Sequence, residues 1–191
     1  MQTKARFLLI WTIVFAALFL VSIFADNALL NIVSEIRASP LDMIAKALAS
    51  VSLLQILVVI AIVLLMKKIH LRRWLLAYVA ASGIVWLSKL TFARSRPFEI
   101  GIIQSMIAET GYSFPSGHAT VLFAAFPIMI DAFPRYRYFI ASVFLVLILS
   151  RVYVGIHYFS DIFGGALLGI VISSVVTRLA SRFLEPHKPI Q

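Results

Sequence analysis

The sequence predicts an all-α protein, a six-transmembrane-helix bundle with an interfacial amphipathic segment between spans one and two. Two observations lead to this fold class. The 191 residues are 62% hydrophobic and only 13% charged, a more apolar composition than that of a soluble domain. The apolar residues also fall in long runs, and about 20 such residues form a helix that crosses roughly 30 Å of hydrocarbon. We expect residues 1–191 to form a single integral membrane domain.

The first expected span is residues 7–24, which carry no charge. Because Lys4 and Arg6 precede this run, it could instead be a cleaved signal peptide. The run is longer than the usual apolar core of a signal peptide, and Ile23-Phe24-Ala25 is a poor small-residue cleavage site. An uncleaved membrane anchor is therefore favoured.

Residues 26–46 come next, and we expect them to form two amphipathic helices in the outer membrane interface. The first has an apolar face of five side chains: Leu29, Leu30, Ile32, Val33 and Ile36. For the second, residues 39–42 supply an N-cap serine, a first-turn proline and an acidic residue at the third helical position. This segment could be a lid over an entrance from the bilayer or a structural brace, and the sequence leaves both open.

Five further spans follow the interfacial segment. The second is residues 47–66, whose polar groups are Gln55 and a few serines. The others are shorter runs that need flanking residues to complete a span: 74–88, 119–133, 138–149 and 162–177. The polar clusters that flank these runs should therefore lie at helix ends near one membrane face. In the last span, Gly165-x3-Gly169 is typical of a close helix contact within the bundle.

The positive charges predict the orientation. With both termini in the cytoplasm, most of the 17 Lys and Arg residues fall in cytoplasmic segments, as the positive-inside rule requires. The expected location is the inner (cytoplasmic) membrane of the cell. The net charge of +9 then mainly reflects the positive residues that set the orientation of the chain in the membrane. Nucleic acid is not an expected partner, because no basic patch is interleaved with aromatics that could stack on bases. The absence of cysteine excludes disulfides, thiolate metal sites and haem attachment.

Three short polar clusters interrupt the apolar sequence. They are Lys89 with Arg96-Pro97, then Pro115-Ser116-Gly117-His118, and finally Ser150-Arg151 with His157 and Asp161. With six spans, all three clusters fall on the extracytoplasmic side. Two histidines and a carboxylate could suggest a metal site, but Lys89, Arg96 and Arg151 would repel a cation and attract a phosphoryl group. We therefore expect a phosphate site with no metal and no other cofactor.

Together, these clusters resemble the three-part signature of the type-2 phosphatidic acid phosphatase superfamily, and the resemblance covers residues 89–161. The family resemblance implies a membrane phosphatase that acts on a lipid phosphate or pyrophosphate. It also implies that His157 attacks phosphorus and that Asp161 orients it. His118 would act as general acid and base, while Lys89, Arg96, Ser116, Gly117 and Arg151 would bind the phosphate. The spacing of His157 and Asp161 agrees with this pairing, because two residues four apart share one face of a helix.

Several alternatives stay open at this stage. Undecaprenyl pyrophosphate is the favoured substrate because the chain shows no added soluble domain, but phosphatidylglycerophosphate, phosphatidate and lipid A phosphate remain candidates. A lipid-to-lipid phosphotransferase, a vanadium haloperoxidase and a non-catalytic lipid binder are less favoured. Each histidine could merely hydrogen-bond at a helix end. Arg94 is either an arginine that extends to the interface or a ligand of a second phosphate. The oligomeric state is not predicted.

Overall fold

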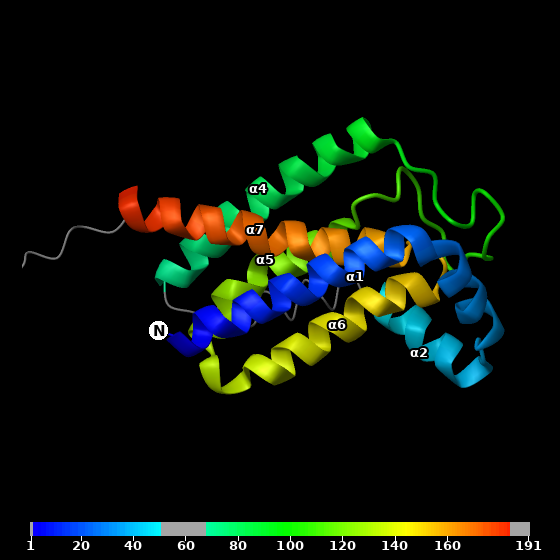
Figure 1. Ribbon diagram of the computed structural model, residues 1–191, viewed down its shortest axis with the longest axis horizontal. Helices are drawn as coiled ribbons and strands as arrows, with labels where there is room; N and C mark the ends of the chain where they lie inside the picture. Colours follow the sequence, from blue (N-terminus) through cyan, green and yellow to red (C-terminus); the bar gives the residue numbers. More distant parts are fainter. Residues whose placement is uncertain (1, 51–67, 184–191) are drawn as a thin grey trace, which may run out of the picture.

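The computed structural model describes residues 2–50 and 68–183, and in these ranges the chain is helical with no β-strand. The helices are α1 (Gln2–Glu35), α2 (Ser39–Ser50), α4 (Lys68–Phe92), α5 (Gly117–Ala132), the 3₁₀ helix η1 (Pro134–Tyr136), α6 (Arg137–Tyr153) and α7 (Phe159–Phe183), as Figure 1 shows. The all-α prediction is therefore confirmed for the described part of the chain.

Within the described residues 2–50 and 68–183, four segments are long and apolar enough to cross a membrane. They are Lys4–Glu35 in α1, Ile69–Phe92 in α4, Pro134–Tyr153 across η1 and α6, and Phe159–Arg182 in α7. Helix α5 is apolar but shorter. The expected second span, residues 47–66, lies outside the described residues except for 47–50, which end α2. The number of six spans therefore stays a prediction.

Helix α1 is longer than the sequence analysis expected. Residues 26–35 continue it without a break, so the prediction of a separate interfacial helix there is wrong. No glycine or proline occurs between residues 2 and 35 to end the helix. Its 34 residues extend about 50 Å, more than the hydrocarbon thickness. Leu30 and Val33 are buried, so this extension packs against the bundle.

Helix α2 agrees with the second expected helix, since it begins at Ser39 and has Asp42 in its first turn. It packs against α6. The Tyr153 hydroxyl donates to Asp42 Oδ1 at 2.9 Å, and Arg37 donates to the Tyr153 carbonyl at 2.7 Å and to the Gln104 carbonyl at 2.7 Å. These bonds fasten the connection between α1 and α2, and the first turn of α2, to the rest of the protein, as a structural brace would be.

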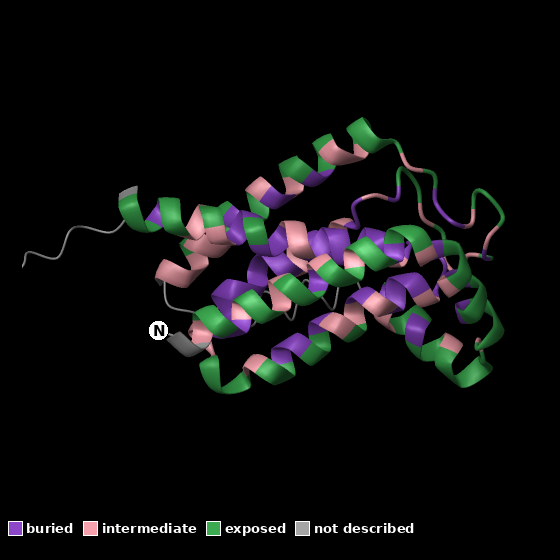
Figure 2. Cartoon of the chain, viewed as in Figure 1, coloured by how far each residue is buried: buried purple, intermediate pink, exposed green. Residues whose placement is uncertain are grey.

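Helix α7 packs against α5, α1 and α4, and Figure 2 shows the buried residues concentrated along the inner helices. Gly165 and Gly169 lie where α7 meets α5. A Cβ at Gly169 would collide with the Thr120 carbonyl oxygen and lie 2.7 Å from the Ala124 nitrogen, and one at Gly165 would lie 2.9 Å from the Ser116 carbonyl oxygen. The expected bundle contact is therefore present, and it brings the first turn of α5 close to α7.

Contacts at the two ends of the bundle agree with the expected alternation of the helices. At one end, Lys4 near the start of α1 and Arg73 near the start of α4 pair with Asp131 at the end of α5, at 2.7 and 3.7 Å. At the opposite end, α4 and α6 finish while α5 and α7 begin (Figure 1). All three polar clusters are therefore at the same end of the bundle.

Candidate active site

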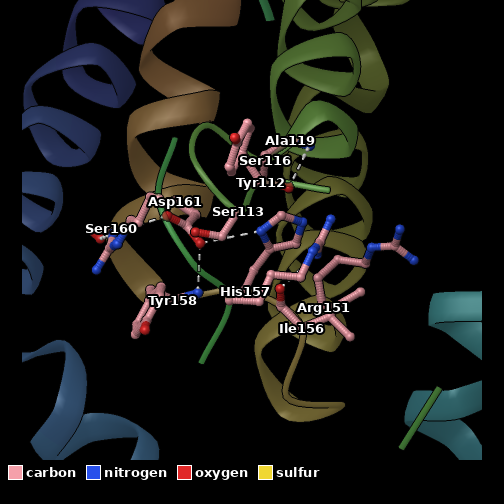
Figure 3. A network of polar contacts seen from close by, with 12 residues as sticks. Tyr112, Ser113, Ser116, Ala119, Arg151, Ile156, His157, Tyr158, Ser160 and Asp161 are labelled. Atoms are coloured by element: carbon pink, nitrogen blue, oxygen red, sulfur yellow. Dashed lines mark hydrogen bonds and ion pairs between the residues drawn. The ribbon is translucent and has the colours of Figure 1, made fainter. Parts of the chain in front are cut away.

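His157 and Asp161 form the centre of the site. His157 lies in the turn before α7 and Asp161 lies in the first turn of α7, so the expectation that a single helix carries both is wrong. They still meet, with His157 Nδ1 3.2 Å from Asp161 Oδ2, as Figure 3 shows. The Tyr158 amide donates to the same oxygen at 2.9 Å. Asp161 thus accepts a backbone N–H group at the N-terminus of α7. The same carboxylate also holds the His157 ring.

Backbone geometry places His157 in this turn. Gly155 has φ of +84°, a left-handed conformation that favours glycine. A Cβ there would also lie 2.8 Å from the Gln104 carbonyl oxygen and 2.9 Å from Arg37. The chain can therefore reverse between α6 and α7 against its neighbours, which directs His157 into the bundle.

Burial controls the proton on His157, whose side chain is only 3% exposed. Burial lowers the pKa of its imidazolium from the ordinary value, and this outweighs the hydrogen bond and charge of Asp161, which raise it. Arg96 and Arg151 lower this pKa further. The ring is therefore neutral at pH 7. With the Nδ1 proton donated to Asp161, Nε2 keeps a free lone pair, which is what a nucleophile requires.

Arg151 and His118 come together from different helices. The Arg151 guanidinium, on α6, has one nitrogen 2.8 Å from His118 Nδ1 and 3.2 Å from His118 Nε2. Its other terminal nitrogen donates to the Ala49 carbonyl. Because a guanidinium can only donate, the His118 ring accepts this bond. His118 itself is in the first turn of α5, which begins at Gly117 after the N-cap Ser116, as expected.

Arg96 and Lys89 hold the loop between α4 and α5. Arg96 is buried and donates to the carbonyls of Gly111 at 2.7 Å, Ile156 at 2.8 Å and Thr110 at 3.0 Å. Lys89 donates to the Tyr112 carbonyl. The bond to Ile156 joins the first cluster to the residue before His157. The structure thus brings residues of all three clusters together, while their catalytic and binding roles stay predictions.

Three further residues in the site were not identified from the sequence. Glu109 lies 3.8 Å from Arg96 and 3.5 Å from Arg151, so it is an anion between two expected phosphate ligands. Asp26 and Ser160 are buried beside Asp161. None of the three is a signature residue, and none has a local pattern of its own. Only the tertiary fold brings them to the site.

The sequence analysis left two interpretations of Arg94 open, and the structure shows its contacts with protein groups. Its guanidinium pairs with Asp161 at 2.9 Å and Asp26 at 2.8 Å, and also donates to the Ser160 hydroxyl at 2.6 Å. The guanidinium lies over the Tyr158 ring, 3.8 Å from its centre.

Comparison with known proteins identifies relatives of this chain. The model of the PAP2 superfamily matches residues 70–185. An undecaprenyl-diphosphatase of Sulfolobus acidocaldarius is 32% identical over 110 residues, which are 56% of this chain and 53% of that protein. Phosphatidylglycerophosphatase B of Bacillus subtilis is 32% identical over 82 residues, 37% of this chain and 40% of that protein. The chain thus spans about half or less of the length of these curated relatives.

A solved structure shares the fold over the whole length. The crystal structure of a transmembrane PAP2-type phosphatidylglycerolphosphate phosphatase from Bacillus subtilis matches with a TM-score of 0.70 and covers 100% of both chains. The two sequences are 21% identical. This similarity supports the helical membrane fold.

Proposed function

This chain belongs to the PAP2 superfamily, and from that premise we propose that it is a membrane phosphatase that hydrolyses a lipid phosphate or pyrophosphate. One observation carries the proposal. The buried His157 is held by Asp161 on one side, and the cationic Arg96 and Arg151 act on it from elsewhere in the site. A neutral nucleophile near fixed positive charges is suited to phosphoryl transfer, which depends mainly on positioning and electrostatics.

The proposed reaction has two steps. First, His157 Nε2 attacks phosphorus and forms a phosphohistidine, and the bond from phosphorus to the leaving oxygen breaks. His118 takes up a proton when the phosphate anion binds beside it, and this imidazolium then gives the proton to the leaving oxygen. In the second step, His118 takes a proton from water, and the water oxygen attacks phosphorus. The bond from phosphorus to His157 Nε2 breaks, and inorganic phosphate is released. Asp161 holds the His157 ring throughout.

Phosphate binding would rearrange one contact. A phosphoryl oxygen attracts the Arg151 guanidinium more strongly than the neutral His118 ring does, so Arg151 would turn to the phosphate. His118 would then be free for proton transfer. The N–H groups at the start of α5 have no intrahelical partner, and they would bind phosphate together with the positive end of the helix dipole. A Cβ at Gly117 would make only an ordinary 3.6 Å contact with Val85, so packing alone does not require glycine there.

Undecaprenyl pyrophosphate is the proposed substrate, and the sequence similarity to an undecaprenyl-diphosphatase supports it. Phosphatidylglycerophosphate is the second candidate, supported by the similarity to phosphatidylglycerophosphatase B. In both cases, the enzyme would take the substrate from the outer leaflet.

Phosphate release from purified lipids tests this function. The purified protein in detergent should release inorganic phosphate from a panel of undecaprenyl pyrophosphate, phosphatidylglycerophosphate, phosphatidate and lipid A, with the highest kcat/KM for the first. A strong chelator should leave the rate unchanged, because cationic side chains take the place of a metal. Protein with His157→Ala, purified in the same way, controls for contaminating phosphatases. No release from any lipid would reject the function, and transfer to an added acceptor lipid without release would indicate a phosphotransferase. Loss of activity with chelator and recovery with Mg²⁺ would reject the metal-free mechanism.

The proposed orientation predicts which loops an impermeant thiol reagent can reach. Because the chain has no cysteine, single cysteines at Gly111 and at Arg135 report on opposite ends of the bundle. In intact cells, the reagent should label the first and leave the second unlabelled until the membrane is opened. The reverse pattern would place the site on the cytoplasmic side.

A further inference from the structure

Arg94 bridges the expected catalytic carboxylate to a second buried carboxylate on α1. One terminal nitrogen of Arg94 donates to Asp161 Oδ1 at 2.9 Å, and the other donates to Asp26 Oδ2 at 2.8 Å. The side chains of Asp161 and Asp26 are 0% and 4% exposed. Two carboxylates buried this deeply would be costly without a cation between them. Arg94 supplies that cation, and its planar fork fixes the position of both carboxylates.

Each oxygen of Asp161 has a partner on a different side. Oδ2 accepts from His157 Nδ1 and from the Tyr158 amide, while Oδ1 accepts from Arg94. The carboxylate therefore cannot rotate without breaking at least one of these bonds. Since Asp161 sets the direction of the His157 ring, Arg94 helps to set it through Asp161.

Asp26 completes the network by joining α1 to the start of α7. Its Oδ1 accepts from the Ser160 amide at 3.0 Å, and its Oδ2 accepts from the Ser160 hydroxyl and from Arg94. Asp26 thus takes up N–H and O–H groups of the first turn of α7, next to Asp161. The extension of α1 beyond the expected first span is what brings this residue to the site.

The surroundings of Arg94 also argue against a role as a phosphate ligand. In Figure 3, Ser160 and Asp161 lie on one side of the His157 ring and Arg151 lies on the other. Arg94 contacts the Asp161 side, and it lines a pocket of about 260 Å³ whose other walls are mainly aromatic and aliphatic: Phe19, Ile23, Phe92 and Phe114. Charges interact more strongly in such a setting than in water.

We propose that Arg94 and Asp26 are positioning residues that hold Asp161 in place and set the proton affinity of His157, a role that rests on the proposed function. The two act with opposite signs. Arg94 places a positive charge next to Asp161 and favours loss of the second proton of the His157 ring. Asp26 partly neutralises Arg94 and weakens that effect.

Other charged and titratable groups also lie in the site. Arg96, Arg151 and His118 interact electrostatically with His157. Glu109 pairs with Arg96 and Arg151, and Lys89 acts on His118. All of these groups are unchanged in variants of Arg94 and Asp26, so a shift between variants reports on the Arg94–Asp26 pair. The ionisation of the substrate is also common to all variants.

The test is the pH dependence of kcat/KM, measured on one soluble aryl phosphate. The quantity compared between variants is the pH at which kcat/KM falls on the acidic side, here called the acid limb. In Arg94→Gln, we expect this fall in activity to move up by about 0.5–1 pH unit, because His157 holds its proton more tightly without the cation. In Asp26→Asn it should move down, by about half as much. The kcat of Arg94→Gln should fall about 10–100-fold, with KM changed by less than about threefold, because Arg94 does not contact the substrate. Arg94→Lys should keep the wild-type limb.

Arg37→Gln is the matched control. It removes the same charge from a loop at the same end of the bundle, but Arg37 contacts the carbonyls of Tyr153 and Gln104 rather than a catalytic carboxylate. It should lower the thermal stability and leave the acid limb in place. If Arg94→Gln does not fold, the other two variants test the inference. The acid limb should move down in Asp26→Asn and stay at the wild-type position in Arg94→Lys.

The outcomes separate this inference from the proposed function. An active wild-type enzyme whose limb stays fixed in Arg94→Gln, or moves in the same direction in Asp26→Asn, would overturn the positioning role and leave the phosphatase intact. A wild-type protein that releases phosphate from neither the aryl phosphate nor any lipid would overturn both. Opposite shifts in the two variants would establish the inference.

Discussion

Replacing His157 with alanine should abolish turnover of every substrate, whatever the leaving group. Only this ring combines deep burial with a carboxylate on Nδ1 at 3.2 Å among the described residues. Without it, no covalent intermediate forms, and we expect kcat to fall by about 10⁵-fold or more. The measurement is steady-state phosphate release together with rapid quench, which should show no burst of leaving group and no phosphorylated protein.

Asp161→Asn is the graded control for this prediction. It keeps the shape of the side chain but weakens its hold on the Nδ1 proton, so we expect a loss of about 10²–10⁴-fold and not complete inactivity. If His157→Ala retained a burst of leaving group, another residue would be the nucleophile. Circular dichroism and size-exclusion profiles like those of the wild type are needed to attribute either loss to chemistry.

The second large effect concerns His118, and its size should depend on the leaving group. In His118→Ala, hydrolysis of a lipid phosphomonoester should slow by about 10²–10⁴-fold, because an alkoxide leaves poorly without a proton. An aryl phosphate needs little protonation, so its first step should be much less affected. A pyrophosphate should fall between these cases, because its leaving phosphate is a weaker base than an alkoxide.

This variant should also accumulate the intermediate. Because His118 is expected to activate water as well, dephosphorylation should stay slow even when phosphorylation is fast. His118→Ala mixed with aryl phosphate should therefore give a burst of phenol and an acid-labile phosphate on His157, detected by rapid quench and mass spectrometry. Phosphate found on His118 in the His157→Ala protein would reverse the two assignments.

The sequence predicted the composition of the site better than its contacts. Lys89, Arg96, Ser116, Arg151 and His157 fall within short motifs, and the alternation of apolar runs indicates that these motifs lie at one end of the bundle. These predictions depend on local patterns and on counting helices. Both kinds of information can be read from a single sequence.

Contacts across long separations could not be predicted in this way. Arg94 meets Asp26 across 68 positions, and no pattern in either segment indicates the other. The expected first span ended at residue 24, two residues before the charged Asp26. In the structure, Arg94 pairs with Asp26, Ser160 donates hydrogen bonds to it, and α1 continues through this position. Burying the Asp26 carboxylate alone would cost free energy. Arg94 and Ser160 offset that cost, and the sequence could not identify them as its partners.

The contact of Gly165 and Gly169 with α5 bears on how proteins with this arrangement can diversify. His118 is carried by α5, and α7 begins with the residues beside His157, so the separation of the two histidines depends on how closely these two helices approach. That approach is set where the two glycines face the backbone of α5 at Ser116, Thr120 and Ala124. Residues 98–108 of the loop before α5, by contrast, include none of the predicted site residues. We therefore expect selectivity for different lipid head groups to change through residues 98–108, while the helix contact keeps the two histidines at the same separation.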